Sequence, residues 1–358
     1  MNRPDPAMGC VRLFVGLALA VMFTGLLTAC GGGSSPSTTA PTPPTPPSPN
    51  QLGSATAVQV TCPTSTVNPP VVGSACYTVT ISCPGVAPYA ADIKVTDPSG
   101  SSVGTVIYTV GGGGNLLYEN EFIYGNTAVN NVVQAGYTAV QTDFNDTSVG
   151  TTGWLDGPGG PLMLSCRWAT LAQWVHDNTT IHPSNTAFCA TGNSGGAGAI
   201  AYSLTRFGGD QIFNYVQPTG GPPFTRIDYG CRCSQQTMQT TDCAGVQSTC
   251  YGSDANMFLD PAYGNANCSN GSLPPQTTQW LADSILSSDG KSQLNYKIPV
   301  HFIFGSLDMG SGSALAVLWE QAITSTHSNE CIADAPHKIA DVLDGAQAIA
   351  KAMIANCH

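Results

Sequence analysis

The sequence predicts an α/β fold, with a mostly parallel central sheet flanked by helices and a disulfide-rich insertion. Short apolar runs that suit strands alternate with runs of helix formers along most of the chain, and 42% of its 358 residues are hydrophobic. Alternation of this kind favours right-handed strand–helix–strand crossovers. From about residue 55 onward the chain has roughly 300 residues, enough for one large domain with an insertion.

Residues 1–29 have the pattern of an export signal. Arg3 and Arg12 flank a short polar start, and the apolar run 13–27 suits a signal peptide but is short for a membrane span. The run ends in Leu27-Thr28-Ala29-Cys30, which resembles the lipobox of bacterial lipoproteins. The resemblance implies acylation of Cys30, a membrane partner through that N-terminal lipid anchor, and a place in the bacterial cell envelope. The Gly31 that follows favours the outer membrane. The alternative is an ordinary secretory signal with a chance cysteine.

Residues 30–54 are rich in Gly, Pro, Ser and Thr. Such a sequence cannot bury a core, and its prolines favour extended segments, so it predicts a tether. The remaining residues, 55–358, are then expected to form the folded domain.

The elements of that domain follow in order. Three short β-type runs, at 57–61, 77–82 and 93–96, predict an antiparallel opening. Afterwards strands alternate with helices. Strands are expected at 105–110, 138–142, 186–191, 212–216, 298–304 and 330–333, and helices at 127–135, 161–176, 195–206, 314–326 and 343–355.

The alternation is interrupted at about residues 217–297. Five cysteines lie between residues 231 and 268, among Gly, Asn, Thr and Gln with little apolar periodicity. A long irregular stretch inside a compact domain is typical of a lid or of a stapled insertion. We therefore expect a Cys-rich insertion over one face of the sheet.

Charge and composition exclude several classes of protein. Only 9% of the residues are charged, the formal net charge is −11, and the 11 Lys and Arg are scattered singly. An ordinary cytosolic protein carries about a quarter charged residues. The sequence also lacks the basic surface that would neutralise phosphates, so we expect no nucleic-acid partner.

The cysteines indicate an oxidising compartment. Leaving aside Cys10 in the leader and Cys30, twelve of the 14 remain, an even number that predicts up to six disulfides in an exported protein. The alternative is a thiolate metal site at Cys231, Cys233 and their neighbours. Their spacing and the export signal argue against it, so we expect no metal. From their layout, two disulfides are expected, Cys331–Cys357 and Cys166–Cys189, and reduction should lower activity before it unfolds the sheet.

The pattern Gly-x-Ser-x-Gly occurs twice. At residues 100–104 it follows Asp-Pro-Ser and precedes a strand, which predicts a β-turn, so Ser102 is set aside. At residues 192–196 it follows an apolar strand and opens a helix. Strand, sharp turn and helix form the geometry that exposes a nucleophilic serine, here Ser194, at the positive end of a helix. A glycine-rich turn or an anion site without catalysis is the alternative.

A serine nucleophile needs a base and a group that orients the base. Asp308 follows the strand 298–304 in a glycine-rich loop, and His337 lies between a short strand and the last helix. The chain order Ser194, Asp308, His337, with each residue at a strand's carboxyl end, predicts a catalytic triad. On these residues the chain resembles the α/β-hydrolase family of serine esterases and lipases, over about residues 77–358.

The resemblance also implies an oxyanion hole. One donor would be the backbone N–H of Gly195. The other would come from Gly111-Gly112-Gly113-Gly114, which resembles the His-Gly-Gly-Gly loop of esterases with Gly111 in place of His. That departure leaves the inward-pointing N–H open between Gly112 and Gly113. A flexible turn at the strand's end is the alternative.

Other residues compete for these roles. His327 is the main rival base, ahead of His176, His182, His301 and His358, and the rival acids are Asp334, Asp283, Asp289 and Asp254. Five aromatic residues are candidates for lining a substrate pocket, although core packing is the better interpretation of Trp168. Residues 217–223 are candidates for the rim of the cleft. The five are Tyr118, Phe122, Tyr124, Trp154 and Trp168.

Together these features predict an exported serine hydrolase that cleaves a small-molecule or polymeric ester through an acyl-enzyme, without a cofactor. The alternatives are a serine peptidase or polyester depolymerase of the same fold, and a non-catalytic, surface-anchored binding or adhesion lipoprotein.

Overall fold

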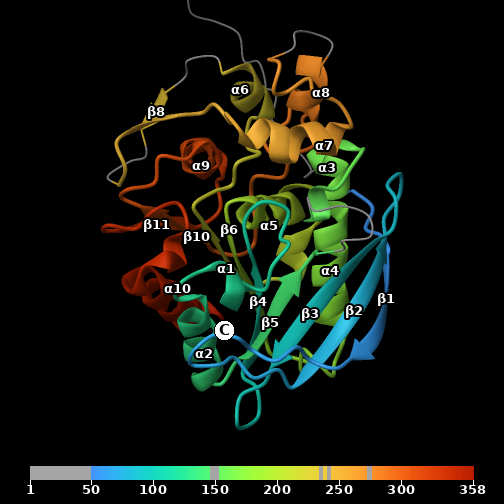
Figure 1. Ribbon diagram of the computed structural model, residues 1–358, viewed down its shortest axis with the longest axis vertical. Coiled ribbons are helices and arrows are strands. Elements are labelled where there is room, and N and C mark those ends of the chain that lie inside the picture. Colours follow the sequence, from blue (N-terminus) through green and yellow to red (C-terminus); the bar gives the residue numbers. More distant parts are fainter. Residues whose placement is uncertain (1–49, 146–152, 234–236, 240–242, 272–275) are drawn as a thin grey trace, which may run out of the picture. The chain divides into compact units, whose positions relative to one another are not determined.

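The computed structural model describes residues 50–145, 153–233, 237–239, 243–271 and 276–358, and within them nine strands form one mixed sheet (Figure 1). The expected leader, Cys30 and most of the expected tether lie outside the described residues. The order of the strands in the sheet is β1-β2-β3-β5-β4-β6-β7-β10-β11. Their bounds are β1 Ser54–Val60, β2 Ala75–Ser82, β3 Tyr89–Thr96, β4 Gly104–Thr109, β5 Thr138–Asp143, β6 Ala187–Asn193, β7 Tyr215–Thr219, β10 Val300–Gly305 and β11 His327–Ile332.

The first part of the sheet is antiparallel and the rest is parallel. β1, β2, β3 and β5 pair antiparallel in turn, whereas β5, β4, β6, β7, β10 and β11 pair parallel. This confirms the predicted antiparallel opening and mostly parallel sheet. Because the carboxyl ends of parallel strands share one edge, the loops after β4, β6, β10 and β11 meet there.

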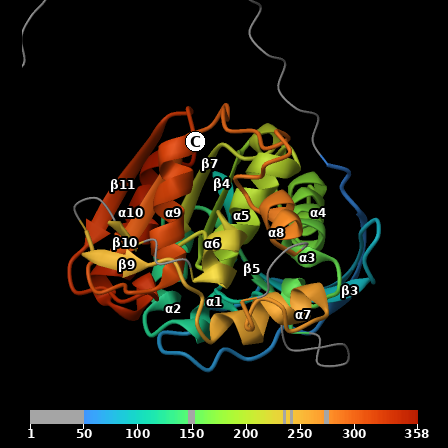
Figure 2. The same cartoon turned by 90° about the horizontal axis from the view of Figure 1, so that it is seen from above.

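Helices cover both faces of this sheet (Figures 1 and 2). Alternate residues of β10 point to the two opposite faces of the sheet. Phe302 and Phe304 pack with α9, whereas Ile303 packs with α10. α2 shares the face of α10, and α4 and α5 share that of α9. The bounds are α1 Tyr118–Glu121, α2 Gly125–Gln134, α3 Gly160–Leu164, α4 Cys166–Asp177, α5 Gly195–Arg206, α9 Ser311–Ala322 and α10 Leu343–Asn356, with 3₁₀ turns η1 Gly153–Leu155, η2 Gly209–Gln211 and η4 Ile339–Asp341.

Four predicted elements differ clearly from the structure. The helix expected at 314–326 is α9 at Ser311–Ala322, and the strand expected at 330–333 is β11 at His327–Ile332. The helix expected at 161–176 is divided into α3 and α4 at Ser165, whose φ and ψ stay helical and whose hydroxyl donates to the carbonyl oxygen of Leu162 at 2.7 Å. The strand expected at 212–216 runs instead over Tyr215–Thr219, since η2 occupies the residues before it and the strand continues through Pro218.

The segment between β7 and β10 contains short elements joined by loops (Figure 1). A two-stranded sheet, β8 with β9, is separate from the main sheet. The elements are α6 Ile227–Arg232, β8 Thr237–Gln239, β9 Val246–Ser248, the π-helical turn η3 Ala255–Leu259, α7 Asp260–Tyr263 and α8 Gln276–Asp283. We call residues 227–289 the insertion. Among the described residues, no helix has the length and apolar character needed to cross a bilayer.

All twelve cysteines outside the leader and Cys30 are paired in six disulfides, as the even count predicted. The pairs are Cys62–Cys76, Cys83–Cys166, Cys189–Cys357, Cys231–Cys268, Cys233–Cys250 and Cys243–Cys331. The cysteines weighed as thiolate metal ligands are therefore bonded to one another or to Cys331.

Both specific pairings expected from the layout are wrong. Cys166 packs in the core on the α4 and α5 side of the sheet, and Cys189 in the core on the α10 side, so the sheet separates their sulfur atoms. Cys331 is exposed on β11 and bonds to the insertion, while Cys357 is buried beneath α10 and bonds to Cys189.

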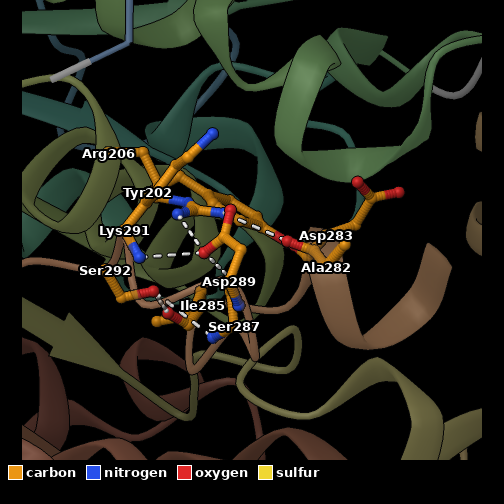
Figure 3. A network of polar contacts seen from close by, with 9 residues as sticks. All are labelled: Tyr202, Arg206, Ala282, Asp283, Ile285, Ser287, Asp289, Lys291 and Ser292. Atoms are coloured by element: carbon orange, nitrogen blue, oxygen red, sulfur yellow. Dashed lines mark hydrogen bonds and ion pairs between the residues drawn. The ribbon is translucent and has the colours of Figure 1, made fainter. Parts of the chain in front are cut away.

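A polar network fastens the end of the insertion to α5 (Figure 3). The Arg206 guanidinium, whose side chain is 1% exposed, donates to both carboxylate oxygens of Asp289 and to the carbonyl oxygen of Ala282. The Tyr202 hydroxyl donates to the carbonyl oxygen of Asp283 at 2.7 Å. Because α5 begins next to Ser194, the network ties the insertion to the helix that carries the serine turn.

Candidate active site

Ser194 lies on the sharp turn between β6 and α5, where the sequence predicted it. Its φ is 52°, a left-handed value that a side chain rarely adopts, so the backbone of this turn is strained. The backbone N–H of Ser194 donates to the carbonyl oxygen of Thr219 at the end of β7, 2.8 Å away. The neighbouring strand therefore holds the turn in place.

Two glycines make this turn possible. A Cβ at Gly192 would lie 2.7 Å from the backbone carbon of Gly196, and a Cβ at Gly196 would lie 2.7 Å from the carbonyl oxygen of Val110. Atoms do not approach so closely without displacement of the backbone. The Gly-x-Ser-x-Gly spacing is thus explained by the close packing of β6, α5 and the end of β4.

Asp308 and His337 meet beside this turn. His337 Nδ1 lies 2.9 Å from Asp308 Oδ2, and Asp308 is fully buried. The carboxylate also accepts hydrogen bonds from the backbone N–H of Gly310 at 2.7 Å and from the Ser313 hydroxyl. Three donors therefore fix the carboxylate, and it in turn orients the imidazole so that Nε2 remains available as a base.

The charge around His337 favours its protonated form. Burial by itself lowers the pKa of His337, but the hydrogen bond and charge of Asp308 and the charge of Asp254 outweigh it, so the pKa is raised above the usual 6.5. The Lys338 ammonium opposes this, although it is paired with Glu121 at 2.5 Å. A positive charge on the His337 imidazole is thus stabilised.

Asn193, which the sequence argument passed over, lies between the serine and histidine segments. Its side chain is buried, and the amide orientation that satisfies its neighbours has Nδ2 donating to the His337 carbonyl oxygen at 3.1 Å and to the Thr219 hydroxyl at 3.0 Å. In the described part of the structure no hydrogen bond joins the Ser194 hydroxyl to the His337 ring. Catalytic contacts of this kind often tighten only when substrate binds.

The glycine loop after β4 lies against the serine turn. Gly112, with φ 57°, lines the same pocket as Ser194 and Gly195, and a Cβ at Gly195 would overlap the Gly112 carbonyl oxygen. Gly113 is buried behind it, and its carbonyl oxygen accepts a hydrogen bond from the backbone N–H of Trp154 at 2.8 Å. Of the two glycines left open by the sequence, Gly112 is therefore the one at the pocket.

The pocket beside Ser194 encloses about 30 Å³. The glycine loop and the serine turn form one side, and the insertion with the segment that leads into it forms the other. The lining residues are Gly112, Ser194, Gly195, Pro223, Phe224, Tyr251, Asp254, Phe258 and Leu259. Pro223 lies at the end of the segment expected to rim the cleft, and Asp254 was named from the sequence only as a rival acid. The other lining residues beyond Pro223 were missed because this part of the sequence has no periodic pattern to place them.

The aromatic residues suggested for this pocket lie elsewhere. Trp154 and Trp168 are fully buried in the core on the α5 side of the sheet. Tyr118, Phe122 and Tyr124 pack in or against the core on the α2 and α10 side. Their apolar surface is buried by core packing, as the helical spacing of Trp168 already favoured.

The rival residues also lie in other surroundings. The His176 and His182 rings stack on each other, His301 contacts Glu330 and Ser328, and the His327 ring contacts the carbonyl oxygen of Ser325. Of the rival acids, Asp289 pairs with Arg206, and Asp254 alone reaches the site, where its charge acts on His337. The Ser102 hydroxyl donates to the carbonyl oxygen of Gly104 at 2.7 Å, in the expected turn.

No protein-family model and no curated protein matches this sequence. Among solved structures the chain is similar to puromycin hydrolase, with a TM-score of 0.50 and 12% identity over 77% of this chain and 38% of that one. It is also similar to Est1E from Butyrivibrio proteoclasticus, with a TM-score of 0.49 and 12% identity over 80% of this chain and 99% of that one. The likeness to dienelactone hydrolase from Anabaena variabilis has a TM-score of 0.45 and 14% identity over 78% of this chain and 95% of that one. At these identities the likeness concerns the fold, an α/β sheet with flanking helices of the α/β-hydrolase type.

Proposed function

We propose that this chain is an exported serine hydrolase that cleaves carboxylic esters through an acyl-enzyme. The observation that carries the proposal is the contact of His337 Nδ1 with the buried Asp308 carboxylate, beside a serine held at positive φ on a strand–helix turn. A structural histidine needs no buried carboxylate behind it and no strained serine in front of it. A hydroxyl exposed on such a turn is the usual form of an activated nucleophile.

Each residue then has a defined part in the reaction. The Ser194 hydroxyl oxygen attacks the ester carbonyl carbon while His337 Nε2 accepts its proton, and Asp308 stabilises the imidazolium. The backbone N–H groups of Gly195 and Gly112 would donate to the oxyanion. His337 passes the proton to the departing alcohol, and water, activated by the same histidine, releases the carboxylic acid and restores Ser194.

The narrow pocket is the reason for proposing an ester with a small acyl group. A volume of about 30 Å³ beside the nucleophile has little room for a peptide side chain. The insertion closes the pocket on the side opposite the glycine loop, so a bound acyl group would be shielded from bulk water. A peptidase or a polyester depolymerase would need a longer substrate-binding groove.

Export and lipidation belong to the same proposal and rest on the sequence. The lipobox-like Leu27-Thr28-Ala29-Cys30 supports acylation of Cys30, and an envelope location would suit a domain with six disulfides. Incorporation of labelled palmitate into the chain, lost in the variant Cys30→Ser, is the measurement that tests this part.

Labelling with a fluorophosphonate tests the catalytic proposal. We expect the intact protein to label and to hydrolyse phenyl acetate, and we expect Ser194→Ala to lose labelling and at least 10³-fold of the hydrolysis rate. Ser102→Ala is the matched control, because it removes the serine of the other Gly-x-Ser-x-Gly pattern and should label like the wild type. Labelling retained in Ser194→Ala would refute the assignment, and a wild type that neither labels nor hydrolyses esters would favour a non-catalytic binding lipoprotein.

A further inference from the structure

Asp254 is the one charged residue among those described as lining the pocket beside Ser194. It directly precedes the turn η3 of the insertion, and its backbone N–H donates to the carbonyl oxygen of Tyr251 at 3.0 Å. The side chains around it are Phe224, Tyr251, Phe258 and Leu259. An otherwise apolar wall thus brings a single carboxyl group to the nucleophile.

The Asp254 carboxylate has unused capacity to accept hydrogen bonds. Within the described part of the chain no group donates a hydrogen bond to it, whereas the Asp308 carboxylate accepts three. The hydroxyl of Tyr251, its neighbour in the pocket, donates to the carbonyl oxygen of Pro223 at 2.9 Å instead. A carboxylate partly removed from water without a donor is costly, so a ligand that supplies a donor gains that missing interaction.

The position of His337 shows which part of an ester would meet Asp254. His337 does not line the pocket, while Ser194, Gly195 and Gly112 do. Since His337 must protonate the departing alcohol, the alcohol lies on its side, and the pocket on the other side receives the acyl group. The pocket is small, with about 30 Å³ open to the centre of a water-sized sphere, so an acyl group with only a few atoms beyond the carbonyl suits it.

During the reaction Asp254 has the positive charge of His337 nearby but, among the described residues, no hydrogen-bond donor of its own. Asp308 balances the imidazolium of His337, and backbone N–H groups serve the oxyanion. The Lys338 ammonium is held by Glu121. A cation on the acyl group would therefore face a carboxylate to which no described residue donates a hydrogen bond, and an anion there would be repelled.

We infer that Asp254 selects esters whose small acyl group carries a hydrogen-bond donor close to the carbonyl and rejects acyl groups with a carboxylate. Among donors, an ammonium group is preferred to a hydroxyl group. The inference rests on the proposed function and names its substrate class. Burial raises the pKa of Asp254 and the charge of His337 lowers it again, with a net rise, so the preference should weaken in acid.

A series of phenyl esters with the same leaving group tests the inference. The acyl groups are propionyl, glycoloyl, glycyl and malonyl, which place a methyl, a hydroxyl, an ammonium or a carboxylate at the same position. At about pH 6 the glycyl amine is protonated. Because the acyl substituents also change the intrinsic reactivity of the ester, each kcat/KM is divided by the rate constant of that ester's uncatalysed hydrolysis at the same pH, and all ratios compare these normalised values. We expect the normalised kcat/KM to be about tenfold higher for glycyl than for propionyl, intermediate for glycoloyl and about tenfold lower for malonyl, as for other sites that recognise a charged or donor group.

The variant Asp254→Asn should bring the glycyl-to-propionyl ratio to within about threefold, because the charge is lost while the size is kept. Asp344→Asn, which makes the same charge change at an exposed residue in the first turn of α10, should keep the wild-type ratio. Equal rates for glycyl and propionyl esters in the wild type, or a ratio unaltered in Asp254→Asn, would overturn the inference while leaving the esterase intact. A protein that hydrolyses none of the esters and does not label with fluorophosphonate would overturn the proposed function as well.

Discussion

The Asn193 side chain links the serine turn to the loop that carries His337. Its amide donates to the His337 carbonyl oxygen and to the Thr219 hydroxyl, and Thr219 in turn accepts from the backbone N–H of Ser194. One buried amide and one threonine therefore fix the distance between two segments more than 140 residues apart in sequence. Asn193 is a positioning residue, since it touches the backbone of the histidine loop and not the reacting atoms.

The pH dependence of hydrolysis follows from the charges that face His337. In the proposed mechanism only the neutral imidazole accepts the serine proton, so kcat/KM should rise with pH through the raised pKa of His337. In Asp308→Asn the favourable charge is lost, and we expect this acidic limb to move to lower pH while the rate falls by about 10⁴-fold. The pH profile of kcat/KM, or the imidazole titration followed by NMR, measures both.

The control for this prediction is Asp334→Asn. Asp334 is close to His337 in sequence, but it is exposed and does not contact the ring, so the acidic limb should stay where it is in the wild type. An acidic limb unchanged in Asp308→Asn, or one that moves as far in Asp334→Asn, would contradict the role given to Asp308.

Sequence reasoning identified residues whose type and chain order are distinctive, and it missed those defined only by tertiary contacts. Ser194, Asp308 and His337 follow recognisable strands, and the structure brings the last two into contact. Ser313 and Gly310, which hold the Asp308 carboxylate, carry no pattern of their own. They lie at the start of α9, and a helix start near a carboxylate was the one signal that could have pointed to them.

At the scale of elements, the packing of β4, β6 and α5 makes the strained turn at Ser194 possible. We expect Gly196→Ala to lower stability by about 1–3 kcal/mol and kcat/KM by at least tenfold, because the added methyl would lie 2.7 Å from the Val110 carbonyl oxygen and displace the serine. Urea unfolding and phenyl acetate hydrolysis measure the two effects.

Gly100→Ala, in the other Gly-x-Ser-x-Gly pattern, provides the control. A Cβ at Gly100 meets no atom within 4 Å, so this variant should behave like the wild type. If Gly196→Ala were as stable and active as Gly100→Ala, the close packing around the turn would be refuted as the reason for its glycines.

Strands and helices were predictable where the hydrophobic periodicity agreed with the positions of the Gly, Pro and Asn residues that separate the elements. The helix expected at 195–206 matches α5, and the antiparallel opening matches β1 to β3. The division between α3 and α4 falls at Ser165, whose hydroxyl bonds back to the Leu162 carbonyl oxygen, and the hydrophobic periodicity does not indicate it. The elements of the insertion are too short to show a hydrophobic periodicity in the sequence. Disulfides rather than an apolar face hold much of the insertion together.

At the scale of the whole domain, the insertion is joined to the sheet by a disulfide and by the Arg206 network (Figure 3). Cys243–Cys331 links it to β11, and β9 reaches the loop after β10, where the Gln247 amide donates to the Asp308 carbonyl oxygen. The pocket wall that carries Asp254 is thus fixed to the strands that carry Asp308 and His337. The pocket and the proposed triad should accordingly be lost together if the insertion detaches.

Acid should weaken this attachment through Asp289. Burial alone raises the pKa of Asp289, but hydrogen bonds from Ser287 and Arg206 lower it to about 2, below its unfolded value of about 4. A lowered pKa stabilises the fold above the unfolded value, and that stability is lost as pH falls towards 2. We expect Asp289→Asn to cost on the order of 1–2 kcal/mol at neutral pH, allowing for solvent screening.

Urea unfolding between about pH 7 and pH 2 measures the free energy of unfolding. The difference in this free energy between the wild type and Asp289→Asn should shrink as the pH falls below about 4. Asp334→Asn, at an exposed residue of the loop after β11, serves as the control and should leave the unfolding curve unchanged at each pH. A gap that persists at pH 2, or none at pH 7, would contradict the stabilising contact with Arg206.

The Cys189–Cys357 bond joins the strand before the serine turn to the segment after the last helix. During synthesis Cys189 emerges long before its partner, and Cys231, Cys233, Cys243 and other thiols appear in between. The native bond must therefore wait until translation has nearly reached residue 357, and earlier oxidation would pair Cys189 with a nearer thiol. Correct assembly of this protein should therefore depend on catalysts that reshuffle disulfides.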